Sequence, residues 1–208
     1  RLQKNVEKDD LLDMLLKARY EDGTPMSRRQ LIDEVLILFT AGHETTANAL
    51  SFTLGLLAEN QDAQRKAYEE IASCNRATDD IMQVIGQLTY TKQCIEEGMR
   101  LYPPAYVIDR IASSDDVYQG TQIKKGSLFL MSVYELQRDE RFWKAPLAFR
   151  PERFEPDNRK EYQEYYYPFG AGPRMCVGNN FAMFEMVMVL AEIIQKYEIH
   201  AVEPIQLN

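Results

Sequence analysis

The stretch FGAGPRMCVG, residues 169–178, places one cysteine and one arginine among three glycines. It lies directly before an apolar run that predicts a final helix from Asn179 to about Tyr197. A thiol at such a position has its thiolate form favoured by the helix dipole and by the free N–H groups of the first turn. The sequence therefore singles out Cys176 as a candidate reactive or ligating group.

Three kinds of site could use this cysteine. A cysteine nucleophile needs a base, but the two histidines of the chain are His43, in the middle of a predicted helix, and His200, near the end of the sequence. A dinucleotide-binding loop needs a third glycine, where this sequence has methionine, and a surrounding βαβ pattern that it lacks. The third kind is a metal site. A lone cysteine cannot complete a zinc or iron–sulfur centre, but it can be the single axial ligand of a haem.

The composition is that of an ordinary globular chain. Its 208 residues, 45% hydrophobic and 27% charged, are enough for one compact unit with a sizeable core. A net charge of -8 without a basic stripe argues against a nucleic-acid partner. The longest apolar run, VLILF, is far shorter than the roughly 20 residues that cross a bilayer, so we expect no membrane span. Three widely spaced cysteines favour a reducing, cytoplasmic compartment, with Cys74 and Cys94 as small buried core residues.

The sequence pattern predicts a mainly α fold with small β elements. Ser27 is expected to cap a long helix from Arg28 to about Glu59, which is apolar on every face around VLILF. Pro103 and Pro104 end another helix. The other predicted elements are helices within 8–20, 62–73, 79–86 and 90–101, strands at 106–112, 116–123 and 126–132, a stretch of little periodicity at 138–170, and a last strand within 198–208.

The middle of the long helix carries AGHETTANA. Ala41, Thr45 and Ala49 fall on one face, and all three are small, so this face leaves room for a flat group. Gly42 weakens a helix by about 1 kcal/mol relative to alanine, and the Thr45 hydroxyl can bond a carbonyl one turn back, so we expect a local opening. We interpret Glu44 beside Thr45 as a proton path, because a buried carboxylate is costly without a task or a partner. The plain alternatives are a surface carboxylate and a self-capping threonine.

Glu97 and Arg100 lie three residues apart on a predicted helix. Such a pair is most often exposed and worth a few tenths of a kcal/mol. A further arginine, Arg153, lies in a segment with too little secondary structure to hold itself. We expect the guanidinium groups of Arg100 and Arg153 to share the Glu97 carboxylate, which would pin this segment to the helix.

Four motifs in this order resemble those of the cytochrome P450 family. AGHETT is similar to A/G-G-x-D/E-T-T, EGMR to E-x-x-R, and PERF to an arginine-bearing meander motif. FGAGPRMCVG fits F-x-x-G-x-R-x-C-x-G at every specified position, namely Phe169, Gly172, Arg174, Cys176 and Gly178. The resemblance covers essentially the whole chain. It implies that residues 1–208 are the C-terminal portion of one P450 domain, truncated at both ends.

The resemblance implies a haem b cofactor, iron protoporphyrin IX, with Cys176 as its axial thiolate ligand and its metal ligand from the protein. Phe169 would pack beside the ligand, and Gly172 and Gly178 would let the loop approach the porphyrin. Arg174 would bind a haem propionate.

Other positions take roles from the same resemblance. Arg110 would also face a propionate, with an exposed strand charge as the plain alternative. Ala41 and Gly42 would contact the haem. Glu44 and Thr45 would be the acid and the alcohol that deliver protons during oxygen activation.

Glu97, Arg100 and Arg153 would form the structural triad behind the haem. One departure is ELQRD, where many relatives have histidine before the arginine and this chain has Gln137. That substitution leaves the corresponding contact undefined.

The implied activity is that of a haem-thiolate monooxygenase. It would insert one oxygen atom from O2 into a small lipophilic substrate, with electrons from a reductase or a ferredoxin. Only Phe39 to Ala41 and Ala105 to Val107 would line the substrate pocket. The alternative is a truncated remnant that neither binds haem nor catalyses, and a membrane anchor ahead of residue 1 stays open beside the cytoplasmic assignment. Without the rest of a P450 chain, we expect large apolar side chains within Leu31–Leu57 and Phe181–Ile194 to be exposed.

Overall fold

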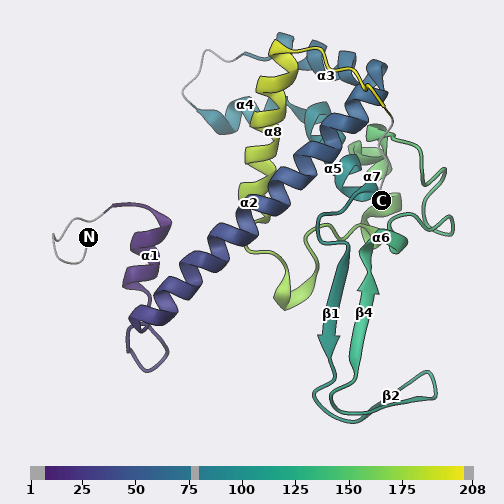
Figure 1. The fold of residues 1–208 in the computed structure, drawn as a ribbon. Coiled ribbons are helices and arrows are strands. Elements are labelled where there is room, and N and C mark those ends of the chain that lie inside the picture. Colours follow the sequence, from purple (N-terminus) through teal and green to yellow (C-terminus); the bar gives the residue numbers. More distant parts are fainter. Residues whose placement is uncertain (1–7, 76–79, 204–208) are drawn as a thin grey trace. The chain divides into compact units, whose positions relative to one another are not determined.

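The computed structural model describes residues 8–75 and 80–203 (Figure 1). The chain divides into two compact units, residues 1–44 and 45–208. The long helix α2, Arg28–Glu59, contributes to both, and its bounds are those predicted from the sequence. In the described residues no helix combines the length and the apolar content needed to cross a membrane.

The first unit contains α1, Leu11–Lys17, and the beginning of α2. The Asp10 carboxylate caps α1 by accepting from the Asp13 amide at 3.0 Å. Ser27 caps α2 as predicted, because its hydroxyl accepts from the Gln30 amide at 3.2 Å. Helix α1 is shorter than expected, since the chain leaves it to form a bridge between Arg19 and Pro25.

Large apolar side chains in this part of α2 are exposed, as expected for the early part of the helix. Phe39 is 70% exposed. The others are Ile32, Val35, Leu36 and Ile37. The expectation is wrong for the second half of α2, where Leu56 and Leu57 are buried in the second unit.

The second unit holds the core. Its helices are α3 Gln61–Ser73, α4 Ile81–Gln87, α5 Thr89–Leu101, α6 Val133–Leu136, α7 Pro156–Tyr162 and α8 Asn179–Lys196. Short 3₁₀ turns are η1 Pro151–Phe154, η2 Gln163–Tyr165 and η3 Gly172–Arg174. Helix α5 is buried over most of its length and contacts α3, α8 and η1, so it is the central element of the unit (Figure 1).

Both sides of α5 are fixed by specific contacts. Its first turn has no cap of its own, and the Glu70 carboxylate of α3 accepts from the amides of Tyr90 at 2.6 Å and Thr91 at 2.8 Å. Further along, a Cβ atom on Gly98 would lie 2.3 Å from the Thr53 hydroxyl of α2. The absence of a side chain at Gly98 is therefore what lets α2 and α5 approach closely.

Helix α8 is covered on one side only. Met186, Leu190 and Ile194 are buried, whereas Phe181 is 74% exposed. Phe184 and Val189 are exposed as well. The expected exposure is thus present at these three positions and absent at the buried ones, which pack in the core with α3 and α5.

The strands form two small antiparallel sheets. Strand β1, Val107–Ile111, pairs with β4, Leu128–Ser132. The single strand predicted at 116–123 is instead a hairpin of β2, Asp116–Tyr118, and β3, Thr121–Ile123. Gln119 and the following glycine both have positive φ, 48° and 82°, which fits a two-residue type I′ turn.

The last predicted strand is absent from residues 198–203, and 204–208 lie outside the described residues. The Ile199 backbone is bonded by a side chain instead. Its N–H donates to the Gln64 side-chain oxygen at 2.8 Å, and its carbonyl accepts from the Gln64 amide group at 2.8 Å. This exchange satisfies the polar groups that a neighbouring strand would otherwise pair.

Candidate functional site

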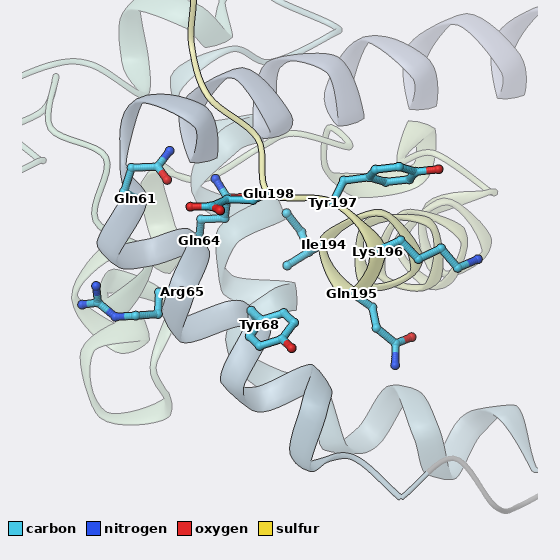
Figure 2. A pocket seen from close by; sticks show the side chains of 9 residues that line it. All are labelled: Gln61, Gln64, Arg65, Tyr68, Ile194, Gln195, Lys196, Tyr197 and Glu198. Carbon is cyan, nitrogen blue, oxygen red and sulfur yellow. The ribbon is translucent and has the colours of Figure 1, made fainter.

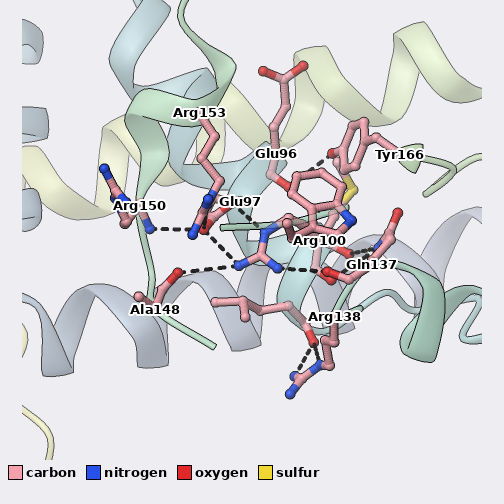
Figure 3. Close-up of polar contacts among 12 residues, drawn as sticks. Glu96, Glu97, Arg100, Gln137, Arg138, Ala148, Arg150, Arg153 and Tyr166 are labelled. Carbon is pink, nitrogen blue, oxygen red and sulfur yellow. Dashed lines mark hydrogen bonds and ion pairs between the residues drawn. The ribbon is translucent and has the colours of Figure 1, made fainter. Parts of the chain in front are cut away.

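The two arginines expected on Glu97 are both present there (Figure 3). Arg100, one turn further along α5, donates from Nε to Oε2 at 2.7 Å and from Nη2 to Oε1 at 2.9 Å. Arg153, in η1, donates from Nε to Oε1 at 3.2 Å. The Arg150 amide adds a fourth donor at 2.9 Å. The carboxylate thus ties the η1 segment to α5, and the Glu97 and Arg100 side chains are fully buried.

This cluster holds two positive charges and one negative charge. Backbone carbonyls balance the excess, because Arg100 also donates to the carbonyls of Gln137 at 2.7 Å and Ala148 at 3.3 Å. Arg153 donates to the carbonyl of Ala145 at 2.7 Å. Buried charges of this kind are tolerated only when their donors are almost all satisfied.

Sequence reasoning missed a second set of contacts on the neighbouring residue of α5. Glu96 pairs with Arg159 of α7 at 2.7 Å, and its carbonyl accepts from the Tyr166 hydroxyl at 3.0 Å. Burial raises the pKa of Tyr166 well above its usual range, and the negative charge of Glu96 adds to the effect. The hydroxyl therefore stays a donor. The one signal in the sequence is the pair of consecutive glutamates on one helix.

The cysteine loop leads from Tyr167 into α8. The Gly170 amide donates to the Tyr167 carbonyl at 3.1 Å, and the Cys176 amide donates to the Phe169 carbonyl at 2.9 Å. Gly170 and Gly172 have φ of 71° and 70°, a conformation that other residues adopt only with strain. These turns fold the chain back so that Cys176 arrives just before the helix.

The three cysteines have different environments. Cys94 is buried, and this burial, with the charges of Glu152 and Glu70, raises the pKa of its thiol well above the ordinary value. Cys74 was expected to be buried but is half-buried, because it follows the end of α3 and packs against the core from outside, with its sulfur 3.9 Å from the Val84 carbonyl. Cys176 is exposed. Of the three, its sulfur is the one most open to a ligand.

Phe169 is half-buried against the main core, which anchors the start of the loop. A Cβ atom on Gly178 would lie 3.9 Å from the Cys176 sulfur, so that side of the thiol stays uncrowded. Nothing lies within 4 Å of the corresponding point at Gly172.

The two arginines predicted to meet propionates are exposed. Arg174 makes no hydrogen bond or ion pair with the part of the chain that the structure describes. Arg110, on β1, donates from one nitrogen to the Asp109 carbonyl at 2.6 Å. Both keep donors for an anionic group.

The predicted positions on the long helix are also exposed: Ala41, Gly42, Glu44 and Thr45. Helix α2 continues without interruption through this region, so the expected local opening is wrong. Glu44 is exposed, so the argument that a buried carboxylate needs a task or a partner does not apply to it. Glu44 closes the first unit while Cys176 lies in the second, so their meeting in one site stays a prediction from the motifs.

A pocket of about 400 Å³ lies elsewhere, between α3 and the end of α8 (Figure 2). Gln61, Gln64 and Tyr68 line one side, and Ile194 and Tyr197 the other. No predicted site residue lines it. Gln61 and Gln64 already donate to the Ile199 carbonyl.

A mainly helical fold, a buried Glu–Arg–Arg cluster and an exposed cysteine loop before a long helix define a P450-like fold. The sequence model of the family described as Cytochrome P450 matches residues 1–206. The chain belongs to the cytochrome P450 family, a family of monooxygenases.

Individual relatives agree with this assignment. The chain is 34% identical to cytochrome P450 4d2 of Drosophila melanogaster, over 93% of this chain and 39% of that protein. It is 36% identical to the chloroplastic carotene epsilon-monooxygenase of Arabidopsis thaliana, over 92% and 36%. It is 32% identical to cytochrome P450 3A13 of Mus musculus, over 95% and 40%. The chain spans about two fifths of the length of the curated relatives it matches.

Proposed function

We propose that this chain carries the cysteine-ligand side of a haem-thiolate monooxygenase. The observation that carries the proposal is the exposure of Cys176. It lies directly before α8, at the end of a loop that turns at two glycines with positive φ. The reaction would place one atom of O2 in a small lipophilic substrate and release the other as water. It consumes two electrons, from a reductase or a ferredoxin, and two protons.

The side chains present fit a haem better than a bare metal ion. Among residues 8–75 and 80–203 no group of three or more His, Cys, Asp or Glu side chains could hold a metal ion. A haem brings four nitrogen ligands of its own and needs one from the protein. It also carries two carboxylates, which suit the unused donors of Arg174 and Arg110.

Each residue then has a defined task. Cys176 would supply the thiolate ligand, Arg174 and Arg110 would hold the propionates, and Gly172 and Gly178 would let the loop backbone approach the ring. When bound, haem supplies oxygen activation, and a thiolate ligand donates electron density that favours O–O cleavage. Glu44 and Thr45 would carry protons to the site as acid and alcohol.

The proposal is tested by adding haem and recording the carbon-monoxide difference spectrum of the reduced protein. The parent should give the red-shifted band of a thiolate complex. Cys176→Ala should lose this band, whereas Cys74→Ala should keep it, because Cys74 lies away from the loop. A parent without any band supports a remnant that binds no haem. A thiolate band that survives in Cys176→Ala would also contradict the assignment.

A further inference from the structure

Gln137, the glutamine of ELQRD, lies beside Arg100 among the buried contacts (Figure 3). It directly follows α6 and is 0% exposed. Its backbone carbonyl accepts from Arg100 Nη1 at 2.7 Å, which attaches it to the Glu97 cluster. Its side chain makes three further hydrogen bonds, in two directions.

The donor side of the Gln137 amide closes the C-terminal end of α5. Nε2 donates to the carbonyls of Met99 and Arg100, each at 3.1 Å. The preceding carbonyl, of Gly98, accepts from the Tyr102 amide at 2.8 Å. The following one, of Leu101, accepts from Arg138 Nε at 3.0 Å. The Gly98 bond is the last helical one, and the three carbonyls beyond it in α5, which lack helical partners, are satisfied by the side chains of Gln137 and Arg138.

The acceptor side reaches the cysteine loop. Oε1 accepts from the Tyr167 amide at 2.9 Å. The Tyr167 carbonyl in turn accepts from Gly170, and the Phe169 carbonyl accepts from Cys176. The orientation of the side-chain amide follows from its partners, since carbonyls lie on one side and an N–H on the other.

We infer that Gln137 is a positioning residue that couples the end of α5 to the first turn of the cysteine loop. The inference rests on the proposed function only where it treats Cys176 as the ligand of a haem. An uncharged amide suits this position because it donates twice and accepts once. A carboxylate would face two carbonyl oxygens, and a neutral imidazole can donate only once while it accepts.

Arg138 provides the matched control. It closes the same helix end through the Leu101 carbonyl and lies against the rings of Tyr102 and Tyr134. No hydrogen bond joins it to the cysteine loop in the described residues. Loss of either side chain removes a cap from α5, but only loss of Gln137 releases Tyr167.

The test is amide hydrogen exchange at Tyr167 and Gly170 in the protein without haem, measured relative to Leu190 of the core. In Gln137→Met, which keeps size and removes the polar atoms, exchange at Tyr167 should be faster by about tenfold or more. Arg138→Met should leave this ratio unchanged. Gln137→His, in which a neutral ring still accepts, should restore protection at Tyr167.

The haem-loaded protein gives a second measurement. Gln137→Met should convert part of the thiolate-type carbon-monoxide band to the band of a protein without thiolate ligation, and Gln137→His should recover it. Equal exchange ratios in Gln137→Met and the parent, or an equal change in Arg138→Met, would overturn the inference. If Gln137→Met does not fold, a folded Gln137→His without protection at Tyr167 overturns it as well. Absence of a thiolate band in the parent contradicts the proposed function alone, because the exchange measurement needs no haem.

Discussion

Two pairs of arginines in the second unit have opposite environments. Arg100 and Arg153 are buried, and together they use one carboxylate and three backbone carbonyls. Arg174 and Arg110 are exposed and keep unused donors. The first pair bonds almost entirely within the chain, where Arg153 Nη1 alone is buried without a hydrogen-bond partner among the described residues, whereas the second pair is exposed. The comparison separates a buried cluster that holds the scaffold together from exposed arginines that the proposed function assigns to an anionic group.

The difference matters because burial changes the value of a charge. A buried ion pair contributes little net stability, but removal of one partner leaves an uncompensated charge in a medium of low dielectric. An exposed arginine loses little when its partner is absent, because water replaces the contact. Substitutions in the two regions should therefore differ in both size and kind.

The largest effect is expected for Glu97→Ala. This change leaves two buried guanidinium groups without an anion and should lower the free energy of unfolding by about 3–5 kcal/mol. Urea denaturation followed by circular dichroism measures it. The control is Asp62→Ala, which removes an exposed pair with Arg65 and should cost less than about 1 kcal/mol. Similar losses of stability in the two variants would contradict the distinction between buried and exposed charges.

A smaller loss is expected for Gly98→Ala. The new methyl group would meet the Thr53 hydroxyl at 2.3 Å, so either the Thr53 side chain or the two helices must shift, at a cost of about 1–3 kcal/mol. Gly86→Ala in α4 has open space and should stabilise by about 0.5–1 kcal/mol. Thermal unfolding of both variants measures the two changes in stability, which should have opposite signs. If Gly98→Ala is also stabilising, the close approach is not a constraint on the scaffold.

The smallest effect on stability is expected for Arg174→Gln. The free energy of unfolding without haem should change by less than about 0.5 kcal/mol, because the side chain is exposed. Haem affinity should fall about tenfold, which corresponds to one charge-assisted hydrogen bond. Titration with haem and denaturation without it separate the two quantities. A destabilised protein with unchanged haem affinity would reverse the roles assigned to the two arginine pairs.

The sequence predicted the elements that carry their own end signals. Ser27 marks the start of α2, and Pro103 and Pro104 follow the end of α5, so both helices were placed within a residue. Helix α7 was missed because seven residues are too few to display a helical period, although Pro156 at its first position is a start signal. The hairpin at 116–123 was missed because its turn pairs glutamine, rather than asparagine or aspartate, with glycine.

Prediction of the candidate site from the sequence has a similar limit. The contact of Arg153 with Glu97 was predictable because three side chains of fixed chemistry suit one another. The bonds of Gln137 were not, because its partners are backbone groups of Met99, Arg100 and Tyr167, which any sequence would offer. Such contacts depend on tertiary placement rather than on residue type.

Trp143 makes the buried cluster observable by fluorescence. It is the single tryptophan of the chain, it is 1% exposed, and its indole N–H donates to the Leu136 carbonyl at 3.2 Å. The Arg100 guanidinium lies 5.0 Å from the centre of its ring, and Tyr162 stacks on it with ring centres 4.8 Å apart. All tryptophan emission of these 208 residues therefore originates beside the Glu97 cluster. Its fluorescence reports the integrity of that one cluster without any added label.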